Sequence, residues 1–454
     1  IPLNGGAQVY LSKIFGELAG FLFTWVAVLV LKPGGAAIIA IIMGEYLVRA
    51  VVGADAASVS PWVNKGVAVV GLGLVTFFNC VSTKVGTRIN DMLMFMKFVA
   101  LIGVTVIGIV VAVTGYSHSG TANRDWKDHA WFDGTKMDAS AWAVALYAGL
   151  WAYDGWDNVS FPPSLLSLFS PLPLSQPPNQ TNFFSQTNYV VGEFRHPGRD
   201  LPRVIHTAMP LVIACYILAN VSYFFVLPFE TINSSNTVAV KFGSQVFGTI
   251  GALIFALIVS ASCFGALNSS TFTSSRLVYV AGKEGYIPSV FGRLGLRDGQ
   301  DPHEPTPLGH GRSGILSRIR AKMVKMLADD EDTSLFFTPI PALSLNFLLT
   351  TGYILVGEFS TLITFYGVAG YTFYFLTVLG LIVLRVREPQ LERPYKTWIT
   401  TPIIFCCVSL FLLSRAVFAQ PLQTLIVVAF VVAGVPVYFI RVKGFSRGGG
   451  RRRG

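Results

Sequence analysis

The stretch Tyr147–Asn158, YAGLWAYDGWDN, decides how the chain folds. It closes an apolar run that begins near Ala141, which places it at membrane depth. Even so it contains two glycines, Gly149 and Gly155, and two carboxylates, Asp154 and Asp157. A carboxylate in hydrocarbon is costly and usually functional, and glycines let a membrane helix break where its freed backbone groups face protein or water. Because broken helices form ligand sites at mid-membrane, the stretch predicts a discontinuous helix beside a substrate site.

A plainer interpretation of the same carboxylates stays open. In it, Asp154 only caps a helix that restarts at Gly155, and Asp157 is solvated at the end of that helix. The two interpretations differ in whether Asp154 faces a substrate site or only caps the restarted helix.

The composition places the whole chain in the membrane. Of its 454 residues 52% are hydrophobic and only 13% are charged, whereas soluble domains carry about 25% charged residues. We therefore expect an all-α polytopic membrane protein in which residues 1–454 form a single domain. Ten apolar runs are long enough to span the membrane: Leu18–Val51, Val67–Ser82, Met92–Gly115, Ala141–Asn158, Thr207–Pro228, Val246–Ser269, Pro341–Val356, Leu362–Leu384, Thr401–Phe418 and Leu422–Ile440. The first is long enough to tilt or kink, with Pro33 and the two glycines after it as the breaker.

Basic residues gather in alternate loops. With the N-terminus inside, the inner segments hold most of the Lys and Arg, including nine from Arg276 to Lys325 and six from Arg441 to Arg453. This bias predicts that both termini are cytoplasmic. It also accounts for the net charge of +10 without a nucleic acid partner. Residues 442–454 form a basic tail that we expect to be disordered and to touch anionic lipid.

Residues 284–338 are the longest polar region, and we expect a cytoplasmic loop there. Within it, Ile315–Leu327 sets apolar against basic residues at helical spacing. This pattern predicts a basic amphipathic helix on the inner leaflet. The alternative is a helix that binds a regulatory partner.

Residues 159–186 differ from their surroundings because they are rich in Pro, Ser and Phe and have no helical period. Their six prolines would destroy a helix where the second half of the broken helix should continue. Without them, YDGWDN runs directly into TNYVVGEFRHPGRDLPR, a continuous span. The segment begins with Val-Ser, which GT-initial codons can encode, and ends in Gln, which CAG encodes. We therefore expect a retained intron, with a genuine lineage-specific loop as the alternative.

Nothing in the sequence points to enzyme chemistry. The five cysteines lie in apolar runs without metal-ligand spacing to a histidine, and the six histidines are scattered. There is no GxxxxGK[ST] phosphate loop and no hydrolase triad. We expect no catalytic residue, no metal and no cofactor.

Four long stretches carry a family resemblance: ALYAGLWAYDGWDN, EFRHPGRDLPRVI, SCFGALNSSTFTSSRLVYVAGKEGYIP and LRVREPQLERPYK. Together they resemble the L-type amino acid transporters of the amino acid–polyamine–organocation superfamily, most nearly the fungal methionine permeases. The resemblance implies a LeuT-like fold of two inverted five-helix repeats plus two helices. The ten runs then correspond to helices three to twelve, and we expect the first two helices to be encoded upstream or to be missing from a defective product.

The resemblance also assigns roles near the break. Trp151 occupies the aromatic gate position that closes over bound substrate, with ordinary core or lipid packing as the alternative. Asp154 falls in the unwound segment, where it would touch the substrate's amino group or a cationic side chain. Gly149 and Gly155 let this helix break and are grouped with the substrate-binding residues. Tyr366 and Phe365 match the substrate-side face of helix ten.

A second group of residues resembles an ion-coupling site. Lys97, in MFMKFVALIG, matches the helix-five lysine that stands in for the sodium ion of related carriers, and it could couple a proton by titrating. The alternative is a lysine that snorkels to the inner face. Ser269 and Ser270 lie in the run that lines the ion or substrate region, although such hydroxyls also bond to carbonyls of their own helix. Further serines in this region are Ser262, Ser274 and Ser275.

The resemblance implies secondary active transport of amino acids by alternating access, with neutral substrates such as methionine or other large side chains. The alternatives are an amino acid sensor without sustained flux and a non-functional truncated transporter. Expected partners are the amino acid, membrane lipids and, as a candidate coupling ion, the proton.

We expect the protein in the plasma membrane, with a vacuolar or other internal membrane as the alternative. The loop GADAASVSPWVNK lacks the cysteine through which animal relatives bind a heavy chain, so we expect no disulfide-linked heavy chain.

Overall fold

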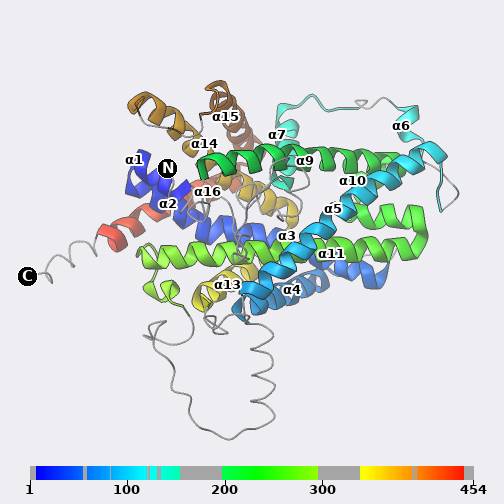
Figure 1. The fold of residues 1–454 in the computed structure, drawn as a ribbon, viewed down its shortest axis with the longest axis horizontal. Helices are drawn as coiled ribbons and strands as arrows, with labels where there is room; N and C mark the ends of the chain where they lie inside the picture. Colours follow the sequence, from blue (N-terminus) through cyan, green and yellow to red (C-terminus); the bar gives the residue numbers. More distant parts are fainter. Residues whose placement is uncertain are drawn as a thin grey trace, which may run out of the picture.

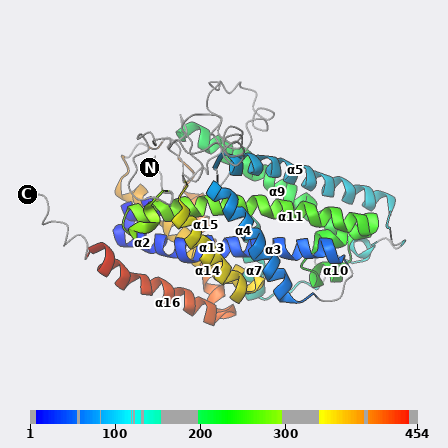
Figure 2. The same ribbon diagram turned by 90° about the horizontal axis from the view of Figure 1, so that it is seen from below.

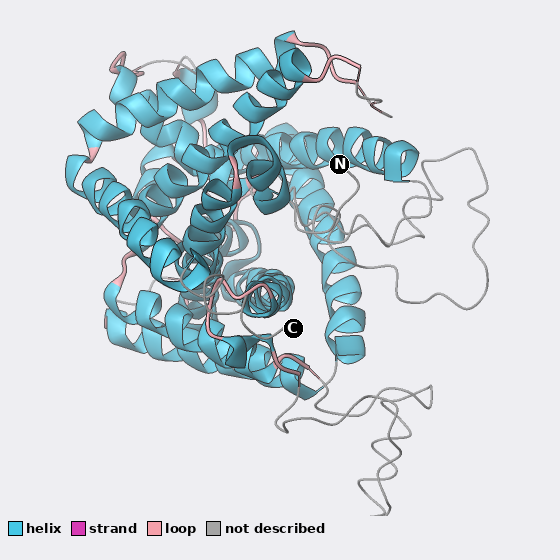
Figure 3. Cartoon of the chain, turned by 90° about the vertical axis from the view of Figure 1, so that its left-hand side faces the viewer, coloured by secondary structure: helices cyan, strands magenta, loops and turns pink. Residues whose placement is uncertain are grey.

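The computed structural model describes residues 7–54, 59–81, 83–118, 120, 123–129, 134–153, 197–294, 338–390, 393 and 396–443. Within these ranges every regular element is a helix, which confirms the all-α prediction, and the helices pack into one bundle (Figures 1 and 3).

Helices correspond to all ten predicted apolar runs. Eight spans in the described part of the chain are long and apolar enough to cross a membrane: Glu17–Val52, Pro61–Val81 (α4), Met92–Thr114 in α5 (Thr83–Thr114), Ile205–Val226 in α9 (Pro197–Val226), Val238–Lys283 (α11), Thr361–Arg387 in α14 (Phe359–Arg387), Thr400–Ala419 (α15) and Pro421–Val442, which comprises α16 (Pro421–Tyr438) and part of η5 (Phe439–Lys443). Two shorter apolar helices are α7 (Ala139–Ala152) and α13 (Ile340–Val356). The remaining short helices are α1 (Ala7–Phe15), α6 (Asp125–Asp128), α10 (Phe229–Ser234) and η4 (Ser289–Gly292).

The first span is one rod with a widened turn in it. It consists of α2 (Glu17–Val26), the π-helical η1 (Ala27–Leu31) and α3 (Lys32–Val52). Pro33 stands at the start of α3 and has no N–H for the carbonyl of Leu29, four residues earlier. The hydroxyl of Tyr353, from α13, donates to that Leu29 carbonyl at 3.1 Å. The predicted breaker therefore produces a π turn inside a continuous span, and a neighbouring helix satisfies the freed carbonyl.

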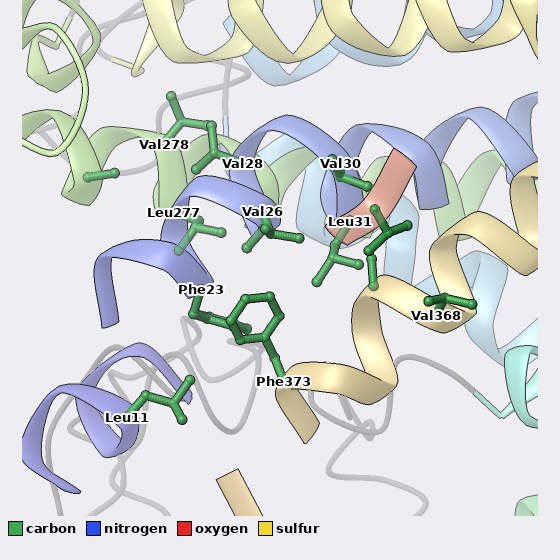
Figure 4. Packing of buried hydrophobic residues seen from close by; sticks show 14 of the residues in the cluster. Leu11, Phe23, Val26, Val28, Val30, Leu31, Leu277, Val278, Val368 and Phe373 are labelled. Atoms are coloured by element: carbon green, nitrogen blue, oxygen red, sulfur yellow. The ribbon is translucent and has the colours of Figure 1, made fainter. Parts of the chain in front are cut away.

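This rod lies at the centre of the bundle. Phe23 of α2 packs edge-on against Phe373 of α14, with ring centroids 5.6 Å apart (Figure 4). Val28 and Leu31 of η1 belong to the same buried cluster (Figure 4). Farther along, α3 runs beside α11 (Figures 1 and 2). A span that is apolar all round is expected to be buried by other helices in this way.

The sixth predicted run, Val246–Ser269, is much longer in the structure. α11 covers Val238–Lys283, with a kink at Gly248, whose φ of 67° and ψ of −151° suit only glycine. The hydroxyl-rich residues that ended the apolar run continue the helix because many of them are buried and hydrogen-bonded, among them Ser274 and Ser275. The sequence pattern alone underestimated this helix at both ends.

Candidate functional site

Helix α7 ends inside the stretch that predicted a break. It begins after Asp138, whose carboxylate oxygens accept hydrogen bonds from the backbone N–H groups of Ser140 and Ala141 at 3.2 and 3.1 Å. It ends at Ala152, where the N–H of Tyr153 turns back to the carbonyl of Leu150 at 3.1 Å. Fourteen helical residues rise about 21 Å, less than the hydrocarbon thickness of about 30 Å. The predicted residues Asp154, Gly155 and Asp157 lie outside the described residues.

Trp151 sits in the last turn of α7 and is half-buried. Its indole meets the ring of Phe359, at the start of α14, edge-on at 6.1 Å and 85°. It also packs against the buried cluster built around residues 36–43 of α3, which we call the α3 cluster. The end of α7 therefore joins the start of α14 and the middle of α3.

One turn earlier on the same face of α7 lies Tyr147, which is 3% exposed. Its ring meets Tyr371 of α14 edge-on at 5.8 Å. It also lies against Gly367, where an added Cβ would come within 2.6 Å of the Tyr147 ring. The Tyr147 hydroxyl is buried without a hydrogen-bond partner in the described part of the chain. Sequence reasoning named the stretch but not this residue, although its spacing of four from Trp151 places both on one face.

Tyr366, next to Gly367, extends this aromatic contact to α3. A Cβ added at Gly35 would lie 3.3 Å from Cε2 of Tyr366, so the ring crosses the α3 backbone just after the π turn. Tyr366 also packs against the α3 cluster, and Phe365 packs against the neighbouring cluster around α2 and η1. Segments far apart in the sequence thus bring Trp151 and Tyr366 to the same buried cluster.

Gly149 does not take part in this contact. It is exposed on the opposite face of α7, and an added Cβ there would meet no atom within 4 Å. The structure therefore separates Gly149 from the aromatic residues with which it was grouped.

The proposed ion-coupling residues lie where α5 packs on α11. The half-buried Lys97 of α5 lies near Cys263 of α11, and Cys263 packs against the α3 cluster from the α11 side. Ser269 of α11 donates to Asn90 Oδ1 at 2.7 Å, which places it in the same α5–α11 contact. Ser270 is half-buried on α11. Helix α3 thus packs against Trp151 and Tyr366 on one side and against α11 on another.

Two other polar residues have structural partners. Asn79 of α4 donates to Asn268 Oδ1 at 2.7 Å and to the carbonyl of Val75 at 2.9 Å. Ser274 donates to Asn346 Oδ1 of α13 at 2.7 Å. These bonds tie α11 to α4 and α13. Among the described residues, no group of three or more His, Cys, Asp or Glu side chains could hold a metal ion.

Comparison with known proteins identifies the family of the chain. The family described as amino acid permease matches residues 1–161 and 183–440. The chain belongs to this family. The permease is 30% identical over 444 residues to the human b(0,+)-type amino acid transporter 1, which covers 97% of the chain and 75% of the relative. It is 32% identical over 444 residues to the mouse large neutral amino acids transporter small subunit 2, covering 97% and 69%. The resemblance to L-type amino acid transporters is thereby confirmed, and the permease is an integral membrane protein of amino acid transport, not an enzyme.

Proposed function

We propose that this permease carries amino acids by alternating access and holds its substrate where α7 ends beside α3 and α14. The observation that carries the proposal is the end of α7 at Ala152, with Trp151 in its last turn. The last carbonyls of a helix lack partners within it and carry partial negative charge, which suits the ammonium group of an amino acid. Asp154, two residues after Ala152, would add a carboxylate for the same group, and Gly155 would free further backbone groups.

Trp151 is the proposed gate. Its edge-on contact with Phe359 is a contact between two aromatic side chains on two helices, so it can form or open with a rotation of either helix. Tyr366 and Phe365 of α14 would form the opposite wall, since Tyr366 lies against Gly35 and Phe365 packs against the cluster around α2 and η1. Closing the indole over the substrate would exclude water from it.

The side chains around this contact favour large neutral substrates. The residues that meet there include Trp151, Tyr366 and Gly35 together with aliphatic side chains of the α3 cluster, and such surfaces bind large apolar or thioether side chains well. The printed name of the mouse relative, a large neutral amino acids transporter, supports the same class. We propose leucine-sized and methionine-like amino acids as substrates.

Lys97 is the proposed coupling cation, and Ser269 and Ser270 are assigned to the same function from the α11 side, where Ser269 contacts Asn90, two turns before Lys97 on α5. Its place in the α5–α11 contact supports this role, because a positive charge there acts on helices that pack on α3. Protons are the candidate coupling ion.

Several features of the whole chain remain proposals. We propose that residues 159–186 are a retained intron, which is supported by a family match that leaves out residues 162–182. We also propose cytoplasmic termini, a plasma-membrane location and no disulfide-linked heavy chain. The charge bias of the loops and the absence of cysteine from GADAASVSPWVNK support the first and last of these.

Uptake of radiolabelled leucine and methionine, in cells whose own permeases are deleted, tests the proposed function. Saturable uptake of both, with weak competition by lysine or glutamate, is the expected result. Binding of leucine without uptake would instead favour a sensor, and neither binding nor uptake would contradict a working carrier.

A further inference from the structure

A seam of buried polar side chains joins α11 to α4 and α13. On α11, Asn268 accepts from Asn79 of α4 at 2.7 Å, and Ser274 donates to Asn346 of α13 at 2.7 Å. These four residues are between 0 and 4% exposed. Two direct hydrogen bonds therefore link α11 to its neighbours among apolar side chains.

Three further polar groups in this seam have no hydrogen-bond partner among the described residues. They are Oγ1 of Thr271, Nδ2 of Asn346 and Oγ1 of Thr350. The three residues are 0, 1 and 0% exposed. Thr271 lies one turn from both Asn268 and Ser274 on α11, and Thr350 lies one turn beyond Asn346 on α13. The helical repeat therefore places them on the faces that carry the direct bonds.

Several other threonine hydroxyls of the bundle are bonded within their own helix, whereas those of Thr271, Thr350 and the neighbouring Thr351 have no partner among the described residues. Thr24, Thr76 and Thr273 each donate to the carbonyl four residues earlier in their own helix, at 2.8 to 2.9 Å. Thr271 and Thr350 make no such bond. Buried polar groups are normally satisfied by protein or by ordered water, so partners other than the described side chains are expected here.

The chemistry of the three groups identifies the partner. An amide Nδ2 can only donate, while a threonine hydroxyl can both donate and accept. A bare cation needs oxygen ligands, and the N–H donor of Asn346 opposes it. Water accepts from the amide and exchanges hydrogen bonds with both hydroxyls. We propose that ordered water occupies the α11–α13 seam, hydrogen-bonded to Thr271, Asn346 and Thr350.

This hydration is independent of the proposed substrate site, and it would make the seam a water-bridged joint. The water completes the polar contact that the Ser274–Asn346 bond begins. Its hydrogen bonds link α11 to α13. Cys263 and Ser269, which contact α5, lie on the same helix α11.

Thr271→Val and Thr350→Val test the proposal in the purified full-length chain. Valine keeps the shape of threonine but removes the hydroxyl. If water is bound, each variant removes one hydrogen bond between the water and the protein, and the melting temperature falls by about 1–3 °C. If the seam is dry, each variant removes a hydroxyl that had no partner, so an unchanged or raised melting temperature would overturn the proposal.

Two controls keep the result specific. Thr273→Val is matched, because Thr273 is 1% exposed on the same helix and its hydroxyl only adds a second bond to the Ser269 carbonyl, which the helix already satisfies. We therefore expect a melting temperature within error of wild type. Thr271→Ser restores a hydroxyl and should recover most of the loss. All measurements are repeated in sodium, potassium and choline chloride. If sodium or potassium raises the melting temperature of wild type but not of Thr271→Val, the seam binds a cation and not water, and the proposal is overturned.

Discussion

Tyr147 and Gly367 fit together because Gly367 has no side chain. The Tyr147 ring occupies the space that a Cβ on α14 would take, and this brings α7 close enough for Trp151 to reach Phe359. At the scale of single residues, the proposed site thus depends on a glycine that makes no polar contact itself.

Gly367→Ala is therefore predicted to disturb the α7–α14 contact. The added Cβ would lie 2.6 Å from Cδ1 of Tyr147, and overpacking of this kind costs about 1–3 kcal/mol. We expect a lower melting temperature and reduced leucine uptake. Gly149→Ala is the matched control on α7, because a Cβ there meets no atom within 4 Å. It should leave both properties near wild type, and a loss of uptake in Gly149→Ala would instead restore Gly149 to the substrate site.

The sequence located part of this contact and missed the rest. Trp151 and Tyr366 were predicted from family resemblance, and they do pack against the same cluster. Tyr147 and Gly35 were not predicted as site residues, because their roles come from what lies opposite them. A tyrosine in an apolar run looks like any core residue until the glycine that receives its ring is known.

At the scale of elements, the widened turn η1 and the helix α13 depend on each other. Pro33 cannot bond the Leu29 carbonyl, and Tyr353 of α13 supplies the missing donor at 3.1 Å. In a membrane such a carbonyl finds no water, so its partner must come from protein.

Tyr353→Phe should destabilise the fold by about 0.5–1.5 kcal/mol, because it removes this donor and little else. A double-mutant cycle with Pro33→Ala makes the test specific. Alanine restores an N–H at position 33 that can bond the Leu29 carbonyl, so Tyr353→Phe should cost less in that background. Equal losses in both backgrounds, measured by thermal unfolding in detergent, would contradict the assigned role of Tyr353.

The ends of helices were predicted least well where polar residues are nevertheless helical. Apolar runs located all ten helices, because spans of this length need many consecutive apolar residues. They ended the run at Ser269 although α11 continues to Lys283, since buried hydroxyls in a helix can bond within the protein. The kink at Gly248 was not predicted, because nothing in the sequence around one glycine of an apolar helix specifies φ.

At the scale of the whole molecule, orientation in the membrane follows from loop charge alone and is open to a direct test. The sequon Asn233-Ser234-Ser235 lies at the exposed end of α10, which the proposed orientation places outside.

We expect N-linked glycosylation at Asn233 in eukaryotic cells, seen as a gel shift that endoglycosidase removes. Asn233→Gln should abolish the shift. The opposite orientation would instead expose the sequons that begin at Asn158 and Asn179. A shift that survives Asn233→Gln but disappears in Asn158→Gln or Asn179→Gln would therefore reverse the proposed topology.

Leucine uptake by Trp151 variants, at matched surface levels in permease-deficient cells, tests most directly whether substrate is enclosed at the end of α7. Trp151→Phe keeps an aromatic cover and should retain uptake within about threefold of wild type, whereas Trp151→Ala should lower it by about tenfold or more. Wild-type uptake by Trp151→Ala would contradict a gate at this position.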